Sequence, residues 1–310
     1  MKWITPPFFI TSFTPSLRRL IPVALVLKNV FNTSVTNNNI TTANQKGYGI
    51  YLESAFGETT NNNNIFYNNI ITTKSLGHGI YINGVNGGYV LSSYISNNNI
   101  QTFSSSSNGI IIETTDISYV DENKLFYNSI NVLGQDSYGM KLISSSNNNI
   151  SDSNISSKNK EDVSVTGNNN IFHNVTYTDE DVTSGNLIRK WYLDVKVNNT
   201  DGNNINQVNV TARNVSGKVQ FSELTDSSGM ISRQELIEYV NNGSIKTYYS
   251  NYTINATKSG YENASQSINL TANKNLIFTM SFLIPNDTHK FYIKNSSNSN
   301  VAWFGSSGNL

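Results

Sequence analysis

The sequence has no cysteine among its 310 residues, so neither a disulfide framework nor a thiolate metal site can form. Charged residues make up only 14% of the chain, and its 21 basic residues equal its 21 acidic residues, which leaves a net charge of zero. The chain therefore lacks the excess of basic residues that is typical of proteins that bind nucleic acid or anionic membranes. No run of about 18 apolar residues occurs, so the sequence predicts no transmembrane helix.

The first residues also lack the pattern of a secretory signal, which needs one unbroken apolar segment and a small-residue cleavage site. Residues 1–22 carry apolar patches, but Pro6, Pro7, Pro15 and the pair Arg18-Arg19 interrupt them. We interpret residues 1–22 as an irregular N-terminus or as the remnant of an upstream coil. What the chain does have is 11% aromatic and 37% hydrophobic residues, which is more than a disordered polar tract carries.

The asparagine-rich segments of the first half recur at a fixed interval. The segment "VTNNNITT" (35–42) has later variants in "YNNIITT" (67–73), "SNNNIQT" (96–102) and "YNSINV" (127–132). A second motif, the pair "GI", recurs at the same interval from Gly49-Ile50 onward. Two landmarks that keep one register indicate a structural repeat. The first landmark recurs every 30 residues, at Ile40, Ile70, Ile100 and Ile130.

Each repeat predicts short β-strands. Its "G-I-x-(I/L)" segment alternates with a period of two, and no helical apolar period appears between residues 30 and 180. Strands joined by asparagine and glycine turns predict an all-β chain in which residues 23–185 form a right-handed parallel β-helix, with the four isoleucines stacked in its core. Asparagine suits the bends because it tolerates the left-handed backbone, and stacked amides can form a ladder. After residue 140 the repeats shorten.

The "NNNI" and "GI-x-I" segments resemble the right-handed parallel β-helix repeats of surface proteins. That superfamily also contains pectate lyases, polygalacturonases and a periplasmic copper-processing family. The resemblance covers residues 23–185 and implies the fold. It implies no single activity, because this scaffold carries many activities and none.

The sequence pattern changes from Trp191 onward, where the asparagine-rich repeats no longer occur. Residues 190–283 contain short alternating segments separated by turn signals, and Asp201-Gly202 predicts a hairpin between the first two. Several strands at this spacing predict a small β-sandwich that follows the β-helix. Residues 232–240 fit either a helix that begins with a capping box or an extended strand. Residues 284–310 predict a short β tail of one or two strands, or the start of a truncated further module.

The motifs "V-x-V-x-x-x-D-G", "T-D-x-x-G" and "Y-x-I-x-A-x-K-S-G-Y" follow one another in this second region. In this order they resemble the carboxypeptidase regulatory-like, or prealbumin-like, domain over residues 190–283. The most specific piece is Lys258-Ser259-Gly260-Tyr261. The resemblance implies a non-catalytic spacer or binding module of an extracellular protein.

The repeat region offers little catalytic chemistry. Its sharpest candidate is Gly77-His78-Gly79, because polygalacturonases carry a Gly-His-Gly, but the aspartate motifs that would supply an acid and a base are missing from the repeats. We therefore expect His78 to be a plain surface histidine. A lyase would need clustered carboxylates with a basic residue, and acidic residues in the repeats are sparse. "DEDVTSG" (179–185) favours a solvated interdomain linker over an ion-binding turn. The sequence predicts no catalytic residue, metal site or cofactor.

Two sets of surface residues remain as candidates. The first is a group of tyrosines that could stack against sugar rings: Tyr48, Tyr81, Tyr89, Tyr94, Tyr119, Tyr127 and Tyr138. The second is an excess of N-glycosylation sequons after residue 190. Strand alternation also raises the sequon count, because it places polar residues at positions i and i+2. The candidate acceptors are Asn198, Asn209, Asn214, Asn242, Asn251, Asn255, Asn263 and Asn269.

We expect a secreted or cell-surface, non-enzymatic protein whose β-helix serves adhesion, glycan binding or envelope structure. Its expected partners are polysaccharides or cell-envelope glycans, with no nucleic acid and no membrane span. The alternative is a polysaccharide lyase or glycoside hydrolase that acts in a groove of the β-helix. A fragment of a larger surface protein without activity of its own is a third possibility. The sequence does not indicate an oligomeric state.

Overall fold

The computed structural model describes residues 9–10, 23–115, 117–283, 291–294, 296–297 and 300–304. The chain forms two compact units that interleave along the sequence, whereas the sequence predicts consecutive domains. Unit 1 comprises Met1–Tyr192, Glu235–Ser250 and Leu270–Asn273, and unit 2 comprises Leu193–Gln234, Asn251–Asn269 and Lys274–Leu310. Among the described residues no helix is long and apolar enough to cross a membrane.

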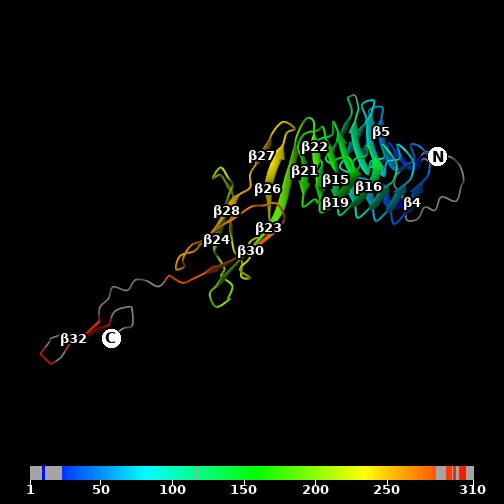
Figure 1. Ribbon diagram of the computed structural model, residues 1–310. Coiled ribbons are helices and arrows are strands. Elements are labelled where there is room, and N and C mark those ends of the chain that lie inside the picture. The colour runs from blue at the N-terminus through cyan, green and yellow to red at the C-terminus, as the bar shows by residue number, and fades with distance from the viewer. Residues whose placement is uncertain are drawn as a thin grey trace. The chain divides into compact units, whose positions relative to one another are not determined.

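Unit 1 is a parallel β-helix, which confirms the predicted fold class. Four stacks of short strands run along it, and successive strands of each stack lie side by side (Figure 1). We name these stacks sheets A to D. Sheet A contains β1 (Phe9–Ile10), β3 (Ser34–Thr36), β7 (Asn64–Phe66), β11 (Tyr94–Ser96), β15 (Lys124–Phe126), β18 (Asn149–Ser151), β21 (Asn170–His173) and β23 (Leu187–Asn199).

The other three stacks complete each coil, and the chain visits sheets A, D, B and C in that order. Sheet D contains β4 (Asn39–Thr42), β8 (Asn69–Thr72), β12 (Asn99–Thr102), β16 (Ser129–Gln135) and β19 (Asn154–Asn159). Sheet B contains β2 (Val23–Lys28), β5 (Tyr48–Ala55), β9 (Ile80–Val85), β13 (Ile110–Thr114), β17 (Met140–Ile143), β20 (Val163–Val165) and β22 (Glu180–Val182). Sheet C contains β6 (Thr59–Asn61), β10 (Tyr89–Leu91) and β14 (Tyr119–Asp121).

The repeat length sets the register of the stacks. Ile40 pairs with Ile70 in parallel, Ile70 with Ile100, and Ile100 with Ile130, and all four side chains are buried. The shortening after residue 140 is visible in the same way, because Leu125 pairs with Ile150 and Ile150 with Phe172. The array continues past residue 185, since β23 pairs with β21. At its start, β1 pairs with β3, so Phe9–Ile10 extend sheet A by one strand.

Left-handed backbone at fixed corners explains the abundance of asparagine. At the corner between sheets A and D, Asn37 and Asn97 have φ of 57° and 54°. Asparagine tolerates this conformation better than most residues because its short side chain bonds locally.

A buried amide ladder follows that corner. The Nδ2 atom of Asn38 donates to Oδ1 of Asn68 (2.9 Å), Asn68 donates to Asn98 (3.0 Å), and Asn98 to Asn128 (3.0 Å). The Oδ1 atoms of Asn68, Asn98 and Asn128 also accept the backbone N–H of the equivalent asparagine in the preceding coil, as from Asn68 to Asn98 (3.0 Å). In the "NNNI" motif one asparagine therefore forms the bend, and the asparagine that follows it forms the ladder.

The glycine of the "GI" motif is required by close packing. A Cβ on Gly79 would lie 2.3 Å from Cγ2 of Ile100 and 2.6 Å from the carbonyl oxygen of Gly109. Gly49 and Gly109 meet Ile70 and Ile130 at similar distances. The two landmarks seen in the sequence are thus the two sides of one contact, repeated from coil to coil.

We expect Gly79→Ala to lower the free energy of unfolding by about 2–3 kcal/mol, because the new methyl group overpacks the core against backbone that cannot withdraw. Urea denaturation measures the effect, with Lys74→Ala in the exposed turn of the same coil as the control. Equal stability of the two variants would contradict the tight contact.

Unit 2 combines a 4-stranded antiparallel sheet with a parallel strand pair. The parallel pair joins Leu193–Asn199 of β23 to β30 (Lys274–Met280). Alternate residues of both parts are buried, among them Val195 and Val197 in the pair and Val210 and Ile254 in the sheet. The antiparallel sheet has the order β25 (Val219–Leu224), β24 (Asn209–Arg213), β28 (Tyr252–Thr257) and β29 (Ala264–Ile268).

The hairpin predicted around Asp201-Gly202 forms only next to its turn, where Asn199 bonds to Asn203 and Ile205 to Val197. A turn forms there, with Gly202 at a φ of 82° and a single antiparallel bridge between Asn198 and Asn204. The flanking strands then separate, because β23 pairs with β30 while β24 pairs with β25 and β28. Of the two alternatives for residues 232–240, the structure has the strand, β26 (Gln234–Asn241). In the tail, β31 (Phe291–Lys294) and β32 (Asn300–Phe304) form an antiparallel pair.

Candidate functional site

The outer side of sheet B carries a cluster of rings that we call the aromatic face. It comprises Tyr48, Tyr51, His78 and Tyr81, with Glu53, Asn83 and Glu113 beside them. Parallel pairing builds it, because Tyr51 of β5 pairs with Tyr81 of β9. Along each strand, the residues on either side of a core isoleucine or leucine point outward. The repeat thus turns single tyrosines into a continuous surface.

The rings of this face contact one another in two coils. Tyr51 and Tyr81 stack at a centroid distance of 5.1 Å, and Tyr48 and His78 stack at 5.2 Å. Tyr48 also meets Tyr81 edge to face at 5.1 Å. Both arrangements are favourable for aromatic pairs, and each is worth about 0.5–1.5 kcal/mol beyond burial. The three tyrosines remain partly exposed, so the cluster has an accessible surface.

Polar groups border the rings along a second row. Glu53, Asn83 and Glu113 occupy one register position in three successive coils. The Tyr81 hydroxyl donates to the Glu113 carboxylate, and Lys28 forms an ion pair with Glu53. Burial, followed by hydrogen bonding to Glu113, raises the pKa of Tyr81, so its phenol stays neutral. Among the described residues, no partner reaches Oδ1 of Asn83, although this residue is only 6% exposed.

The structure places His78 differently from the sequence prediction of a plain surface residue. Its ring is only 8% exposed, because it lies against Tyr48 and beside Tyr81. Its Nδ1 accepts a hydrogen bond from the backbone N–H of Asn108 (3.1 Å). Burial, with a smaller contribution from the positive charge of Lys141, lowers the pKa of His78 to about 4. The imidazole is therefore neutral near pH 7.

The lowered pKa gives a pH-dependent stability. The ordinary value is 6.5, so between about pH 6.5 and pH 4 the unfolded chain binds a proton that the folded chain does not. Unfolding becomes easier as the pH falls through this window, by about 3 kcal/mol at its lower end. We expect His78→Asn, which installs the residue found at position 108, to remove this part of the acid sensitivity. Urea denaturation of both proteins at pH 7 and pH 4 measures it, and equal losses would contradict the buried neutral histidine.

The acidic residues do not converge on a catalytic arrangement. The described residues contain no group of three or more His, Asp or Glu side chains placed to hold a metal ion. Glu53 and Glu113 lie two coils apart with Asn83 between them, and each already has a partner. The structure thus brings His78, Glu53 and Glu113 together around aromatic rings and not around a metal site or a catalytic pair.

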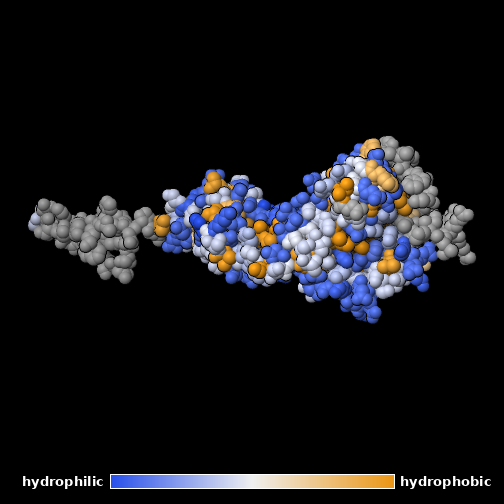
Figure 2. Space-filling view, turned by 90° about the horizontal axis from the view of Figure 1, so that it is seen from above, coloured by the Kyte–Doolittle hydropathy of each residue, from blue (hydrophilic) through white to orange (hydrophobic). Residues whose placement is uncertain are grey.

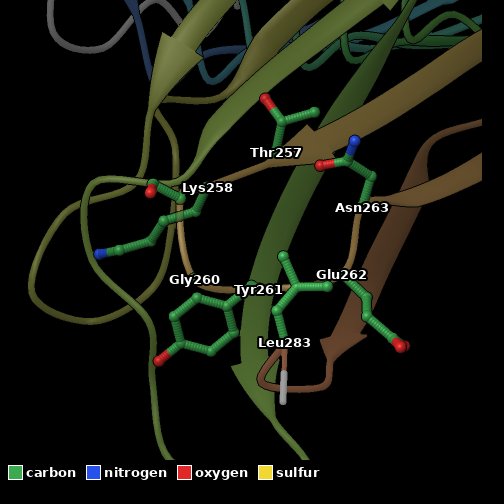
Figure 3. A pocket seen from close by; sticks show the side chains of 8 residues that line it. Thr257, Lys258, Gly260, Tyr261, Glu262, Asn263 and Leu283 are labelled. Carbon is green, nitrogen blue, oxygen red and sulfur yellow. The ribbon is translucent and has the colours of Figure 1, made fainter. Parts of the chain in front are cut away.

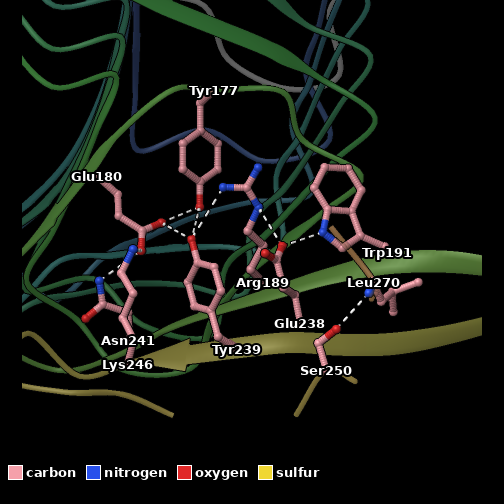
Figure 4. A network of polar contacts seen from close by, with 10 residues as sticks. All are labelled: Tyr177, Glu180, Arg189, Trp191, Glu238, Tyr239, Asn241, Lys246, Ser250 and Leu270. Carbon is pink, nitrogen blue, oxygen red and sulfur yellow. Dashed lines mark hydrogen bonds and ion pairs between the residues drawn. The ribbon is translucent and has the colours of Figure 1, made fainter. Parts of the chain in front are cut away.

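A second polar cluster lies at the last coils of unit 1, and no sequence motif predicts it. The hairpin of β26 and β27 (Lys246–Tyr248) joins the end of sheet A. It brings Glu238, Tyr239 and Lys246 to the coil that contains Glu180 and Arg189 (Figure 4). These partners lie about 50 residues apart in sequence, so no local motif connects them.

The carboxylate of Glu180 is the centre of this cluster. It accepts hydrogen bonds from the hydroxyls of Tyr177 and Tyr239 and from Nδ2 of Asn241 (2.8 Å), and it pairs with Nζ of Lys246 (2.9 Å). Burial alone would raise the pKa of Glu180, but these donors outweigh it and hold the pKa below its ordinary value. The prediction of a solvated linker at 179–185 is therefore wrong.

Arg189 completes the cluster on the other side. Its guanidinium lies 4.1 Å from the Tyr177 ring centroid and forms an ion pair with Glu238 (3.4 Å). Glu238 also accepts a hydrogen bond from Nε1 of Trp191 (2.5 Å). Because these charges are engaged with one another, the cluster ties the hairpin to the coils and presents no free acid or base.

The remaining candidate tyrosines lie apart from the aromatic face. Tyr89 and Tyr119 stack at 5.5 Å on sheet C, and Tyr94 lies beneath the ammonium of Lys124 on sheet A. Tyr138 contacts Lys141 and Lys160, and Tyr127 packs edge to face on Phe126. On the face seen in Figure 2, hydrophobic residues form separate patches in a largely polar surface.

The eight sequon asparagines differ in exposure. Asn214 is buried, and its Oδ1 accepts hydrogen bonds from Ser216 and Lys218 in a tight turn. The exposed asparagines are Asn242, Asn251, Asn263 and Asn269, and the partly exposed ones are Asn198, Asn209 and Asn255.

Unit 2 has a shallow depression of about 520 Å³ at the turn between β28 and β29 (Figure 3). It is lined by Lys258, Gly260, Tyr261 and Asn263, among others. Gly260 adopts a φ of 84°, which explains the glycine of the "KSGY" motif. Tyr261 packs on Phe282 at 4.4 Å, and Nζ of Lys258 donates to a backbone carbonyl. The "KSGY" motif thus forms a turn, and its side chains do not place reactive groups around a common point.

Comparison with known proteins adds little. No protein-family model and no curated protein matches the sequence. A solved structure of the Bacillus anthracis TIE protein is similar over 43% of this chain and 28% of that chain, with 16% identity and a TM-score of 0.24. A likeness this distant carries no argument about function, and the matched part spans less than a third of that protein.

Proposed function

We propose that this chain is a non-enzymatic, cell-surface or secreted protein whose β-helix binds glycans. The observation that carries the proposal is the aromatic face, where partly exposed tyrosine rings adjoin a row of amide and carboxylate groups. Sugars present flat C–H surfaces that pack on aromatic rings and hydroxyls that bond to amides and carboxylates. The partly exposed carboxylates of Glu53 and Glu113 are acceptors suited to sugar hydroxyls.

The state of the polar groups favours binding over catalysis. Glu113 is engaged with Tyr81 and Glu53 with Lys28, and the imidazole of His78 stays neutral because its pKa is about 4. General acid–base catalysis works best with groups that titrate near the working pH. The groups of this face are better suited to fixed hydrogen bonds than to proton transfer.

An extracellular setting is part of the proposal. The resemblances to β-helix surface proteins and to the carboxypeptidase regulatory-like domain support it, as does the excess of sequons after residue 190. Exposed Asn242, Asn251, Asn263 and Asn269 are the acceptors that we expect to carry glycans in a glycosylating host.

A polysaccharide panel tests the function. We expect wild-type protein to bind at least one cell-envelope or plant-wall polysaccharide and to release no reducing or unsaturated sugars from it. Tyr51→Ala/Tyr81→Ala should weaken binding about 10–30-fold, because each lost aromatic contact costs about 1 kcal/mol. Asn83→Ala, which leaves the rings in place, should weaken binding by a smaller factor, and Tyr119→Ala on sheet C serves as the control.

Two results would overturn this proposal. Sugar release that disappears in Glu53→Gln or Glu113→Gln would establish a lyase or hydrolase instead. The glycan-binding role would also be wrong if wild-type protein, shown to be folded by its circular dichroism spectrum, bound none of the polysaccharides.

A further inference from the structure

A second exposed group of rings lies at the corner between sheets A and D, away from the aromatic face. Tyr67 and Tyr127 are 58% and 59% exposed, and they pack edge to face on Phe66 and Phe126 at 5.6 Å and 5.8 Å. We call these two pairs the corner rings. They occupy the same position two coils apart, because the backbone N–H groups of Tyr67 and Asn97 bond to carbonyl oxygens of the following coils in one register.

Both tyrosines adopt a backbone conformation that aromatic residues avoid. Their φ angles are 57° and 55°, in the left-handed region, where coils before and between them carry Asn37 and Asn97. Asparagine is tolerated in this region and a bulky residue is not. The corner therefore holds tyrosine at two places where asparagine would serve the fold better. Unfavourable backbone conformations of this kind cluster at functional sites.

The spacing of the corner rings defines what they can hold. Two coils separate them, which is about 9.6 Å at the usual strand spacing of about 4.8 Å. The intervening coil carries the smaller Ser96 and Asn97 at the equivalent positions. In an extended β-linked hexose chain, every second ring repeats at about this distance with the same orientation. Such a chain, laid parallel to the axis of the β-helix, would place one sugar on each tyrosine.

The surroundings of the corner rings indicate a neutral ligand. On the sheet D side the neighbouring outward residues are uncharged, and Nδ2 of Asn99 already donates to Oδ1 of Asn69 (2.9 Å) in an exposed ladder. On the sheet A side the ammonium of Lys124 lies over the Tyr94 ring. In the next coil, Asp152 is engaged with Asn174 and Tyr192. Amides without net charge suit sugar hydroxyls, and Lys124 is the only cation among these residues.

We propose that the corner rings form a second binding site, specific for a neutral, extended β-linked polysaccharide that runs along the β-helix axis. This inference rests on the proposed glycan-binding role and adds the site, the ligand class and the direction of the chain. It also predicts a length dependence, because only an oligosaccharide of three or more units can cover both tyrosines.

Titration calorimetry with neutral β-linked glucan, mannan and chitin oligosaccharides of two to six units tests the proposal. For one of these series we expect affinity to rise at least tenfold when the chain reaches three units. Tyr127→Asn should abolish that step, and Tyr67→Asn/Tyr127→Asn should remove binding at this site. These variants restore the residue of neighbouring coils, so we expect an unchanged or raised melting temperature. Tyr119→Asn, at an exposed tyrosine on sheet C, is the matched control.

The outcomes separate this inference from the proposed function. If the double corner variant binds as wild type does while Tyr51→Ala/Tyr81→Ala loses binding, the aromatic face binds glycan and the corner site is wrong. If neither variant changes the affinity of a bound glycan, both sites are wrong. A preference for charged polyuronides that depends on the corner rings would overturn the neutral ligand class.

Discussion

Ile100→Asn is expected to lower the free energy of unfolding by about 5 kcal/mol or more. Ile100 is fully buried and lies between Ile70 and Ile130 in adjacent coils. Removing a buried isoleucine side chain costs about 2–5 kcal/mol, and the new amide would add about 1–3 kcal/mol because nothing in the isoleucine stack can bond to it. Urea denaturation followed by circular dichroism measures the loss.

Asn97→Ser is the matched control, three residues away in the same coil. Asn97 is partly exposed and left-handed, with a φ of 54°, and Ser92 and Ser106 adopt φ of 52° and 53° in the same stretch of chain. Serine is therefore compatible with this backbone, and we expect a change within about 0.5 kcal/mol. If both variants were equally stable, the isoleucine stack would not be the core of the fold.

Asn98→Ala is expected to cost about 4 kcal/mol, although it removes only a polar side chain. Asn98 is 1% exposed and takes part in four hydrogen bonds of the ladder. The substitution removes the acceptor of the Asn68 backbone N–H, one acceptor of Asn68 Nδ2, and the Nδ2 donor to the Ile65 carbonyl and to Oδ1 of Asn128. A buried group left without its partner costs about 1–3 kcal/mol, and a connected network loses more than one bond.

The adjacent Asn99 gives a control with the same chemistry on the outside. Its Nδ2 also bonds to the equivalent asparagine, Asn69, but at an exposed position where water replaces the lost partner. We expect Asn99→Ala to change the free energy of unfolding by less than about 1 kcal/mol. Thermal and urea unfolding of the two variants compare them directly. Similar losses would show that the buried ladder does not stabilise the coils.

The β-helix could be predicted because its core recurs in the sequence. Each coil needs an apolar residue at the same place, so Ile40, Ile70, Ile100 and Ile130 mark the register without any knowledge of contacts. The reason for the glycines was not visible, because the contact between Gly79 and Ile100 joins positions that only the stacking brings together. The turn signal at Asp201-Gly202 predicted the turn but not the pairing of the strands on either side of it. There β23 pairs with β30 and β24 pairs with β28, which are distant in sequence.

The candidate sites were harder to predict than the fold. The sequence pointed to Tyr48, His78 and Tyr81 but left out Tyr51, and it could not show that these rings would stack on one face. His78 was expected at the surface because its position varies between coils, where Tyr48, Asn108 and Tyr138 are its equivalents, but the neighbouring rings bury it. The Glu180 cluster depends on a hairpin, from residue 235 onward, that packs on the β-helix of unit 1. No periodic pattern in the sequence predicts that contact.

Each repeat forms one coil, so that equivalent outer residues lie in straight rows along the β-helix. The absence of cysteine allows spin labels to be placed at will. Asn39 and Asn154 are exposed equivalents on sheet D, four coils apart through Asn69, Asn99 and Ser129.

A dipolar distance measurement between labels at Asn39→Cys and Asn154→Cys tests this claim. The β-helix predicts a narrow distribution near 19 Å between the attachment points, four times the strand spacing of about 4.8 Å. A flexible chain of the same 115 residues would give a broad distribution centred near about 60 Å. The narrow distribution near 19 Å is the expected result, and the broad one would contradict the coil register on which both binding surfaces depend.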